Sequence, residues 1–304
     1  MSAFVFFVLS CIYGLLTLFL NVVIIHIIWK HRSTFKSTFY YLFVFDAILN
    51  MITFINTFIM YHLSTAIGPE NTLATIYSNQ GAQIEVFLSY QLAFMQYTST
   101  FLISLNRVFV CYKLANSGII RIWDHTNKKL RYTLSFFFMV ICYLAPVGDT
   151  HRLLVVDAYT YYSREQQQFM FVIQMKLDDQ FLILNPFIFT MTLFSLFVNI
   201  QSIRKIFRFT KTHFNNNSRR QKTEVSLVYW TLVTCASQVF GVTISFLRVY
   251  GNFDDTSMLS LLAICSDFLS LHQPWILLCF SKDALDLPGS TAPVLTSVCV
   301  IERP

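Results

Sequence analysis

The chain has 304 residues, of which 55% are hydrophobic and only 12% are charged. Soluble domains carry roughly 25% charged residues, and the core of a soluble protein of this size could not bury so much apolar surface. The net charge of +6 comes from basic residues in short segments between apolar runs, whereas nucleic-acid binding requires a basic stripe on a soluble domain. We therefore expect an all-α membrane protein that is surrounded by the lipid bilayer and binds no nucleic acid.

Seven apolar runs along the chain predict a bundle of seven transmembrane helices. The first run has no charged residue apart from a possible charge at His26. At about 26 residues it is longer than the apolar core of a signal peptide, so we expect it to be retained. The fourth run is short, with Pro146 near its outer end, and residues 153–156 could extend it. The predicted helices are residues 4–29, 38–62, 85–112, 132–148, 180–203, 225–247 and 257–281, all in one domain of residues 1–281.

The basic residues between the runs predict the orientation, because cytoplasmic segments of membrane proteins are enriched in Lys and Arg. If the first connection lies inside the cell, the inner segments hold 18 of the 22 Lys and Arg residues. An odd number of spans then places the N-terminus outside the cell and the C-terminus in the cytoplasm. Residues 282–304 form a cytoplasmic tail, and residues 149–179 form the longest outer segment.

The third helix ends in the sequence Leu105-Asn106-Arg107 at the predicted inner face of the membrane. An arginine within a span costs about 2.5–3.5 kcal/mol at the helix centre and less near the interface, so it must reach the phosphates or meet a partner. One hypothesis is that Glu224, at the start of the sixth helix, pairs with Arg107 and holds the inner ends of the third and sixth helices together. The alternative is that Glu224 is a solvated acid among basic neighbours.

Several polar residues in different helices are predicted to lie at one depth. With a rise of 1.5 Å per residue, they lie roughly 12–14 Å from the inner ends of the first, second and seventh helices. A buried carboxylate needs partners or must take up a proton. We therefore expect an interhelical polar cluster, which either rearranges when the helices move or holds them statically. Its members are Asn21, Asp46, Asn50, His272, Gln273 and Pro274.

Asp267 lies deeper, at about 21 Å from the inner end of the seventh helix. Acidic residues within membrane spans are candidates for function. Asp267 could face a ligand cavity lined also by Tyr90, Gln91 and Tyr97. It could instead be a protonated carboxyl group that is hydrogen-bonded to Ser89, Gln91 or Gln96.

The seven cysteines show no spacing typical of a metal site, and no pair of them lies in the outer segments. We read them as small apolar packing residues. The sequence therefore predicts no disulfide between outer segments, no bound metal and no cofactor.

Four segments resemble the class gamma serpentine chemoreceptors of nematodes, a family of receptors similar to G-protein-coupled receptors. They are residues 39–56 (FYYLFVFDAILNMITFIN), residues 104–107 (SLNR), the Ile122-Trp123 pair, and residues 266–283 (SDFLSLHQPWILLCFSKD). The resemblance covers nearly the whole chain. It implies a receptor with seven helices in the plasma membrane of sensory neurons, which signals through a heterotrimeric G protein.

The chain departs from the rhodopsin-like receptors in several places. Asn106 stands where those receptors have an acid before the arginine, and Gln273-Pro274 stands in place of Asn-Pro, with Leu277 at the tyrosine position. The sixth run has no proline, so a proline-kinked hinge is not expected there. The seventh run has no lysine near its middle, which excludes a retinal Schiff base at that position.

The expected function is detection of an external small-molecule or peptide ligand, with transmission to the G protein through a shift in the population of bundle arrangements. A seven-helix transporter or channel without G-protein coupling is the alternative. The two halves of the chain show no internal repeat, which weakens that alternative. An intramembrane hydrolase using Asp46 and Asp267 is disfavoured, because their predicted depths differ by about 9 Å. We therefore expect no enzyme activity.

Overall fold

The computed structural model describes residues 3–30, 38–67, 79–114, 140, 143–144, 146–154, 158–164, 168–174, 177–212, 219–250 and 261–275. Most of the predicted fourth span, 132–148, lies outside the described residues. The tail, 282–304, also lies outside them.

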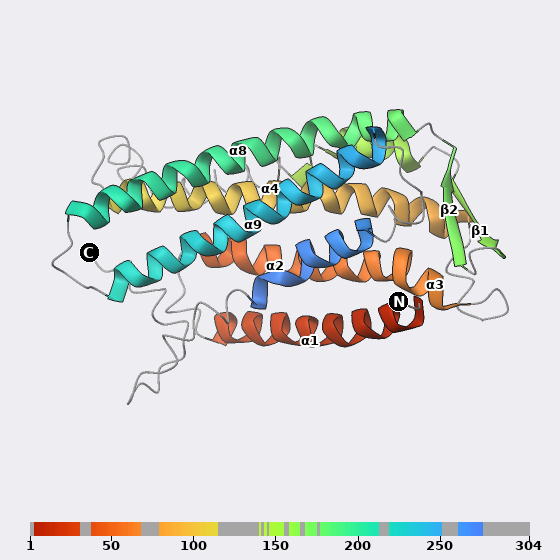
Figure 1. Ribbon diagram of the computed structural model, residues 1–304, viewed down its shortest axis with the longest axis horizontal. Helices are drawn as coiled ribbons and strands as arrows, with labels where there is room; N and C mark the ends of the chain where they lie inside the picture. The colour runs from red at the N-terminus through yellow and green to blue at the C-terminus, as the bar shows by residue number, and fades with distance from the viewer. Residues whose placement is uncertain are drawn as a thin grey trace.

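Long helices lie side by side and form an elongated bundle (Figure 1). They are α1 (Ala3–Lys30), α2 (Thr38–Thr57), α4 (Asn79–Leu114), α8 (Leu177–Thr212) and α9 (Arg219–Tyr250). Residues 261–275 form a further helical segment, which we call helix 261–275. The central helix is α4, which packs against α2, α8 and α9.

Within the described residues, four helical stretches are long and apolar enough to cross a membrane. They are Phe7–Lys30, Tyr41–Leu63, Leu184–Lys205 and Thr231–Arg248. The central helix α4 is not among them, because it carries polar residues along its whole length. Its position explains this composition, since polar side chains on α4 face other helices instead of lipid. The buried polar side chains of α4 include Glu85, Gln91, Gln96, Ser104 and Arg107.

The second helix changes its winding near its end. Thr57 is followed by a π-helical turn, Phe58–Leu63, and then by the short helix α3 (Ser64–Ala66). A π turn is wider than an α turn and occurs often at functional sites. This turn carries His62, whose side chain is only 1% exposed. The sequence predicted an ordinary helix over 38–62 and gave no sign of the wider turn.

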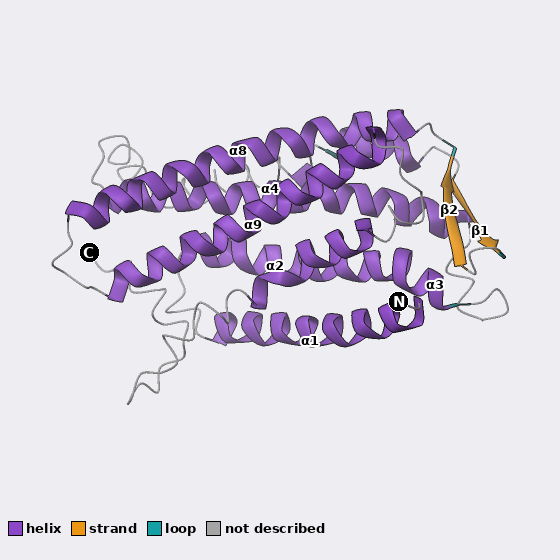
Figure 2. Cartoon of the chain, in the orientation of Figure 1, coloured by secondary structure: helices purple, strands orange, loops and turns teal. Residues whose placement is uncertain are grey.

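The outer segment contains regular structure that the sequence did not predict. The short helices α7 (Val147–Thr150) and η3 (His151–Leu154) are followed by two strands, β1 (Ala158–Ser163) and β2 (Gln168–Ile173). The strands pair antiparallel, with Ala158 opposite Ile173 and Ser163 opposite Gln168. Figure 2 shows this hairpin at one end of the bundle. The described helices agree with a helical membrane protein, and the hairpin is an addition in the outer segment that the sequence did not predict.

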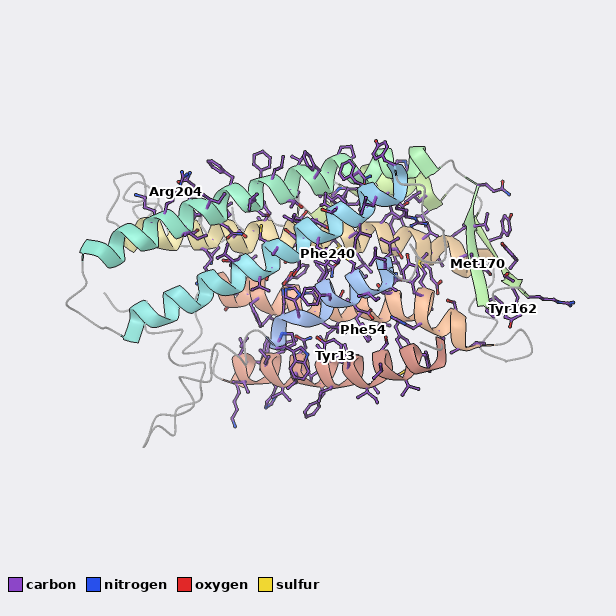
Figure 3. The ribbon with its side chains drawn as sticks, viewed as in Figure 1. Tyr13, Phe54, Tyr162, Met170, Arg204 and Phe240 are labelled. Atoms are coloured by element: carbon purple, nitrogen blue, oxygen red, sulfur yellow. The ribbon has the colours of Figure 1, made fainter. Side chains whose placement is uncertain are left out.

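The two ends of the bundle differ in what they carry. The start of α1 lies at the same end as the β1–β2 hairpin, while the end of α8 and the start of α9 lie at the opposite end (Figure 1). Figure 3 shows Tyr162 and Met170 on the hairpin and the basic side chain of Arg204 toward the other end of α8. The predicted placement of the N-terminus and of the outer segment on one side agrees with this arrangement.

The first two helices approach each other closely at Gly14. A Cβ atom added to Gly14 would lie 2.1 Å from the Cζ atom of Phe54 in α2, which is far inside van der Waals contact. On the same helix, Tyr13 stacks on Trp275 with ring centroids 5.8 Å apart, and the Trp275 indole N–H donates to Thr17 Oγ1 at 2.8 Å. These contacts hold α1 against both α2 and helix 261–275.

A Gly14→Val substitution should destabilise the bundle, because Phe54 has no room to accept the added methyl groups. Overpacking of this kind costs roughly 1–3 kcal/mol. The midpoint of thermal unfolding in detergent measures the effect. Gly148→Ala is the matched control, since nothing lies within 4 Å of a Cβ added there. Equal midpoints for the two variants would contradict the close packing of α1 on α2.

Candidate functional site

A buried carboxylate, Asp46, lies at the centre of the polar contacts between helices. Its side chain is only 1% exposed. Its Oδ2 atom accepts hydrogen bonds from Asn50 Nδ2, one turn further along α2 at 3.3 Å, and from Gln273 Nε2 on helix 261–275. A carboxylate in a low-dielectric interior is costly unless donors surround it. These two amides therefore join α2 to helix 261–275 through Asp46.

The central helix α4 enters the same network through Gln96. Its Nε2 atom donates to Asn50 Oδ1 at 2.8 Å and to Ser270 Oγ at 3.1 Å. Pro274 follows Gln273. Because proline has no backbone N–H, the Ser270 carbonyl does not receive the usual helical hydrogen bond from position 274. We call Asp46, Asn50, Gln96, Ser270 and Gln273 the inner polar network. It connects α2, α4 and helix 261–275 at one level of the bundle.

The structure divides the single polar cluster that the sequence predicted. His272 turns away from Asp46: its Nδ1 atom lies 2.8 Å from the Phe268 carbonyl oxygen, and its Nε2 atom lies 3.2 Å from Thr234 Oγ1 on α9. Successive residues of a helix point about 100° apart, so His272 and Gln273 cannot both face Asp46. Asn21 is buried, and within the described part of the chain neither atom of its amide has a hydrogen-bond partner.

A second set of polar contacts lies nearer to the hairpin end. His62 Nε2 lies 2.8 Å from Asp267 Oδ2, and Thr57 Oγ1 lies 2.8 Å from Ser266 Oγ. The first contact is an ion pair when the imidazole is protonated and a hydrogen bond when it is neutral. Of the two alternatives for Asp267, a hydrogen bond to Ser89, Gln91 or Gln96 is not found among the described residues, where Asp267 contacts His62. The π turn accounts for the difference, because it directs His62 toward helix 261–275.

More polar and aromatic groups surround this level. Asn56 Nδ2 donates to Ser89 Oγ at 2.8 Å and so joins α2 to α4. One turn earlier on α4, Glu85 is buried, and its Oε2 atom has no hydrogen-bond partner among the described residues. Arg248 of α9 acts electrostatically on the hydroxyl groups of Tyr61 and Tyr90. We call Tyr61, His62, Glu85, Tyr90, Arg248 and Asp267 the outer polar group.

The four residues predicted to line a ligand cavity do not converge on one point. Tyr90 and Asp267 belong to the outer polar group. Gln91 instead donates from Nε2 to the Tyr143 carbonyl oxygen at 2.9 Å and accepts from Thr150 Oγ1 at 2.8 Å, so it holds the segment before the hairpin. Tyr97 is buried beside Gly241, and its hydroxyl donates to the Gln238 carbonyl oxygen at 3.4 Å. Gln91 and Tyr97 thus contact neighbouring segments.

Arg107 lies near the end of α4 that is remote from the hairpin, and its side chain is only 3% exposed. Asn106 beside it is partly buried. The side chain of Glu224 lies outside the described residues, so its pairing with Arg107 stays a prediction. A buried arginine at this level agrees with a packed inner end and disagrees with an arginine that reaches freely into solvent.

Comparison with known proteins assigns the chain to a family. A family model described as "Srg family chemoreceptor" matches residues 7–284. The chain belongs to the Srg family of chemoreceptors. It is also similar to serpentine receptor class gamma-31 of Caenorhabditis elegans, with 23% identity over 287 residues that cover 87% of this chain and 86% of that protein. The resemblance drawn from the four segments is confirmed, and the chain is a multi-pass membrane protein of this family.

Two residues of the polar contacts in this Srg-family chain were not singled out from the sequence. His62 stood at the predicted end of the second helix, and Gln238 stood unremarked within the sixth run. Both carry polar side chains inside apolar runs, which is the signal that identified Asp46 and Asp267. A search for polar side chains inside apolar runs, extended from charged to neutral side chains, would have found both residues.

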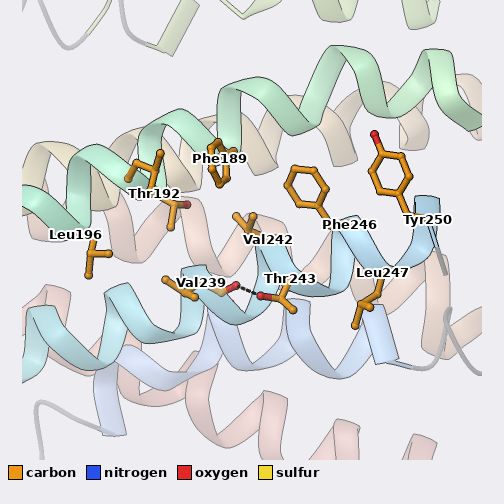
Figure 4. A pocket seen from close by; sticks show the side chains of 10 residues that line it. Phe189, Thr192, Leu196, Val239, Val242, Thr243, Phe246, Leu247 and Tyr250 are labelled. Carbon is orange, nitrogen blue, oxygen red and sulfur yellow. Dashed lines mark hydrogen bonds between the residues drawn. The ribbon is translucent and has the colours of Figure 1, made fainter.

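A cavity of about 490 Å³ lies between α8 and α9 (Figure 4). Its walls are apolar, and the hydroxyl groups of Thr192 and Thr243 donate to carbonyl oxygens of their own helices at 2.7 and 2.8 Å. Phe189, Leu193 and Tyr250 in its walls are exposed. It therefore offers mainly hydrocarbon contacts at the surface of the bundle, with the Tyr250 hydroxyl at one end.

No metal centre is found in the described part of the chain, where no three His, Cys, Asp or Glu side chains are grouped so that they could hold an ion. Cys11, Cys235 and Cys265 are free thiols. The chemistry that the described residues offer is hydrogen bonding and ion pairing between helices.

An Asp46→Leu substitution should destabilise the receptor, because it leaves the amide donors of Asn50 and Gln273 without their acceptor. A buried donor without a partner costs about 1–3 kcal/mol. Asp46→Asn keeps one carbonyl oxygen and should cost less. Thermal unfolding in detergent measures both, with Ile48→Leu on the exposed face of α2 as the control. A midpoint unchanged by Asp46→Leu would show that the inner polar network does not hold these helices.

Proposed function

We propose that this Srg-family chain is a chemosensory receptor that detects an external ligand and signals to a heterotrimeric G protein. The observation that supports the proposal best is the arrangement of polar contacts at two levels of one apolar bundle. The outer polar group and the inner polar network share helix 261–275, through Asp267 at one level and Ser270 and Gln273 at the other. A change at the first level can therefore be passed to the second.

The ligand is proposed to bind at the outer polar group. This group lies toward the end of the bundle that carries the hairpin, which is the outer end on the predicted orientation. Glu85 Oε2 and Asp267 Oδ1 are buried acceptor atoms without a hydrogen-bond partner among the described residues. Buried polar atoms are normally paired, so these two atoms can accept hydrogen bonds from a ligand that carries N–H or O–H donors.

Transmission would follow from unequal binding to two arrangements of the bundle. A ligand that hydrogen-bonds to Asp267 Oδ1 would draw the carboxylate away from His62, which contacts Oδ2. Loss of the His62 contact would free helix 261–275 to turn or slide against α2. Because Gln273 and Ser270 lie on the same helix, the inner polar network would then rearrange, and α4 would move with Gln96.

The receiving surface for the G protein is proposed to lie at the opposite end. Arg107 lies there near the end of α4, and Arg204 is exposed near the end of α8. The basic residues between α8 and α9 that the sequence places inside the cell would face the same partner. They would also attract anionic lipid, at about 1 kcal/mol per residue near the surface.

A transporter or channel is the alternative that the sequence left open. Such proteins often bind substrate at interrupted helices. In this chain α8 continues through Pro186 without a break, and Thr190 Oγ1 donates to the Pro186 carbonyl oxygen at 2.6 Å. No feature of the described residues favours a conducting path.

An Arg107→Ala substitution should lower G-protein activation several-fold without lowering the amount of receptor at the cell surface. Loss of a buried charge at the inner end alters the surface that the G protein meets. The measurement is the ligand-independent binding of labelled GTPγS to the G protein, in membranes that contain the receptor and a G-protein heterotrimer. Arg164→Ala, at the exposed tip of the hairpin, is the control. Equal GTPγS binding with wild type and with Arg107→Ala would overturn the proposal. An ionic current or solute transport by the chain in cells without G protein would also overturn it.

Asp267→Asn should raise the half-maximal concentration of an activating compound about tenfold, which corresponds to roughly 1.4 kcal/mol of binding free energy. The substitution removes the charge but keeps a hydrogen bond with His62 feasible. Activating compounds come from a calcium-reporter screen that includes amines and alcohols. Ile264→Ala, on the exposed face of the same helical segment, should leave the response unchanged. An unaltered dose response of Asp267→Asn would place the ligand elsewhere.

A further inference from the structure

A small enclosed cavity lies where four helices meet. Its volume is about 10 Å³, and it lies between α2, α4, α9 and helix 261–275. Most residues in its walls have polar side chains, and they include Asn50, Gln96, Thr234, Gln238, His272 and Gln273. This cavity adjoins the inner polar network on the side that faces α9.

Two glutamine side chains in its walls carry atoms that nothing else satisfies. Gln238 is only 1% exposed, and neither its Nε2 nor its Oε1 atom has a hydrogen-bond partner among the described residues. Gln273 uses Nε2 to donate to Asp46, while its Oε1 atom has no such partner. The walls therefore present one donor and two acceptors that lack partners.

Buried amides without partners are rare, and each costs about as much as a lost hydrogen bond. Native proteins satisfy such groups with buried water, which needs roughly 10–15 Å³ of free volume and between two and four polar partners. The volume and the three atoms match these needs. We propose that the cavity binds one ordered water molecule, which accepts from Gln238 Nε2 and donates to Gln273 Oε1.

The chemistry of the walls favours water over a monovalent cation. A cation requires oxygen ligands only, but Gln238 Nε2 is a donor that would point a positive hydrogen at it. The carboxylate of Asp46, which could neutralise a cation, is not part of the walls and already accepts two hydrogen bonds. A water molecule can both donate and accept and so satisfies both kinds of atom.

The bound water would extend the inner polar network to α9. Without it, this region contacts α9 through His272–Thr234 at 3.2 Å and Tyr97–Gln238 at 3.4 Å. With it, a continuous chain runs from Gln238 through water and Gln273 to Asp46. Separation of α9 from helix 261–275 would then break this chain first. The water site itself requires neither a ligand nor a G protein.

An experimental structure of the whole receptor, at a resolution that shows ordered water, tests the site directly. The expected result is a density peak within hydrogen-bond distance of both Gln238 and Gln273. An empty cavity would overturn the proposal. A peak surrounded by oxygen atoms alone, which appears only in sodium-containing buffer and is absent when choline replaces sodium, would also overturn it.

Thermal unfolding of purified variants gives a second test, in which the direction of the change in the unfolding midpoint decides between a bound water and a dry cavity. If water bridges the two glutamines, Gln238→Met removes the amide that binds the water and should lower the unfolding midpoint by about 2–4 °C. Gln238→Asn keeps the amide and should lose less. If the cavity is dry, Gln238→Met removes an unsatisfied amide and raises the midpoint, which would contradict the proposal. Thr243→Val, on α9 but outside the cavity, is the control. These measurements do not involve signalling, so their failure is distinct from a failure of the proposed function.

Discussion

A carboxyl group that is kept out of water constrains the whole bundle. Asp46 lies in the interior of helices that are otherwise apolar, and a carboxylate in such surroundings is tolerated only when donors are held against it. Asn50 is supplied by the same helix, but Gln273 must come from another. The relative position of α2 and helix 261–275 is therefore set by electrostatics as well as by packing. The central position of α4 follows, since Gln96 completes the partners of Asn50.

A helix with many buried polar side chains, α4, occupies the middle of the bundle. Polar side chains of α4 bond to α2 through Asn56 and Asn50, to α8 through Asn199 and Ser104, and to helix 261–275 through Ser270. Hydrogen bonds between helices in a membrane contribute about 1 kcal/mol each, which is less than the cost of leaving the groups unpaired in hydrocarbon. Their main effect is therefore to specify which helices are neighbours and in which rotation.

The sequence predicted those features that depend on position along the chain. Runs of apolar residues placed the long helices, and depth along each helix placed Asp46, Asn50 and Gln273 in one layer, where hydrogen bonds now join them. Features that depend on rotation about a helix axis were not predicted. His272 shares that depth but faces α9, and Asn21 is buried without a hydrogen-bond partner among the described residues. The π turn that directs His62 toward Asp267 leaves no composition signal, and the β hairpin lies in a segment whose tyrosines and glutamines read as an irregular loop.

The wide turn at residues 58–63 has a consequence for how such receptors can diversify. It contains one amino acid more than the same length of regular helix would need. Loss of a single codon there would restore regular winding, leave the earlier part of the helix in place and rotate the last turn. A different side chain would then meet Asp267 at the same depth. If the ligand binds at Asp267 as proposed, deletion or insertion of one residue in this turn would change ligand preference without any substitution in the surrounding helices.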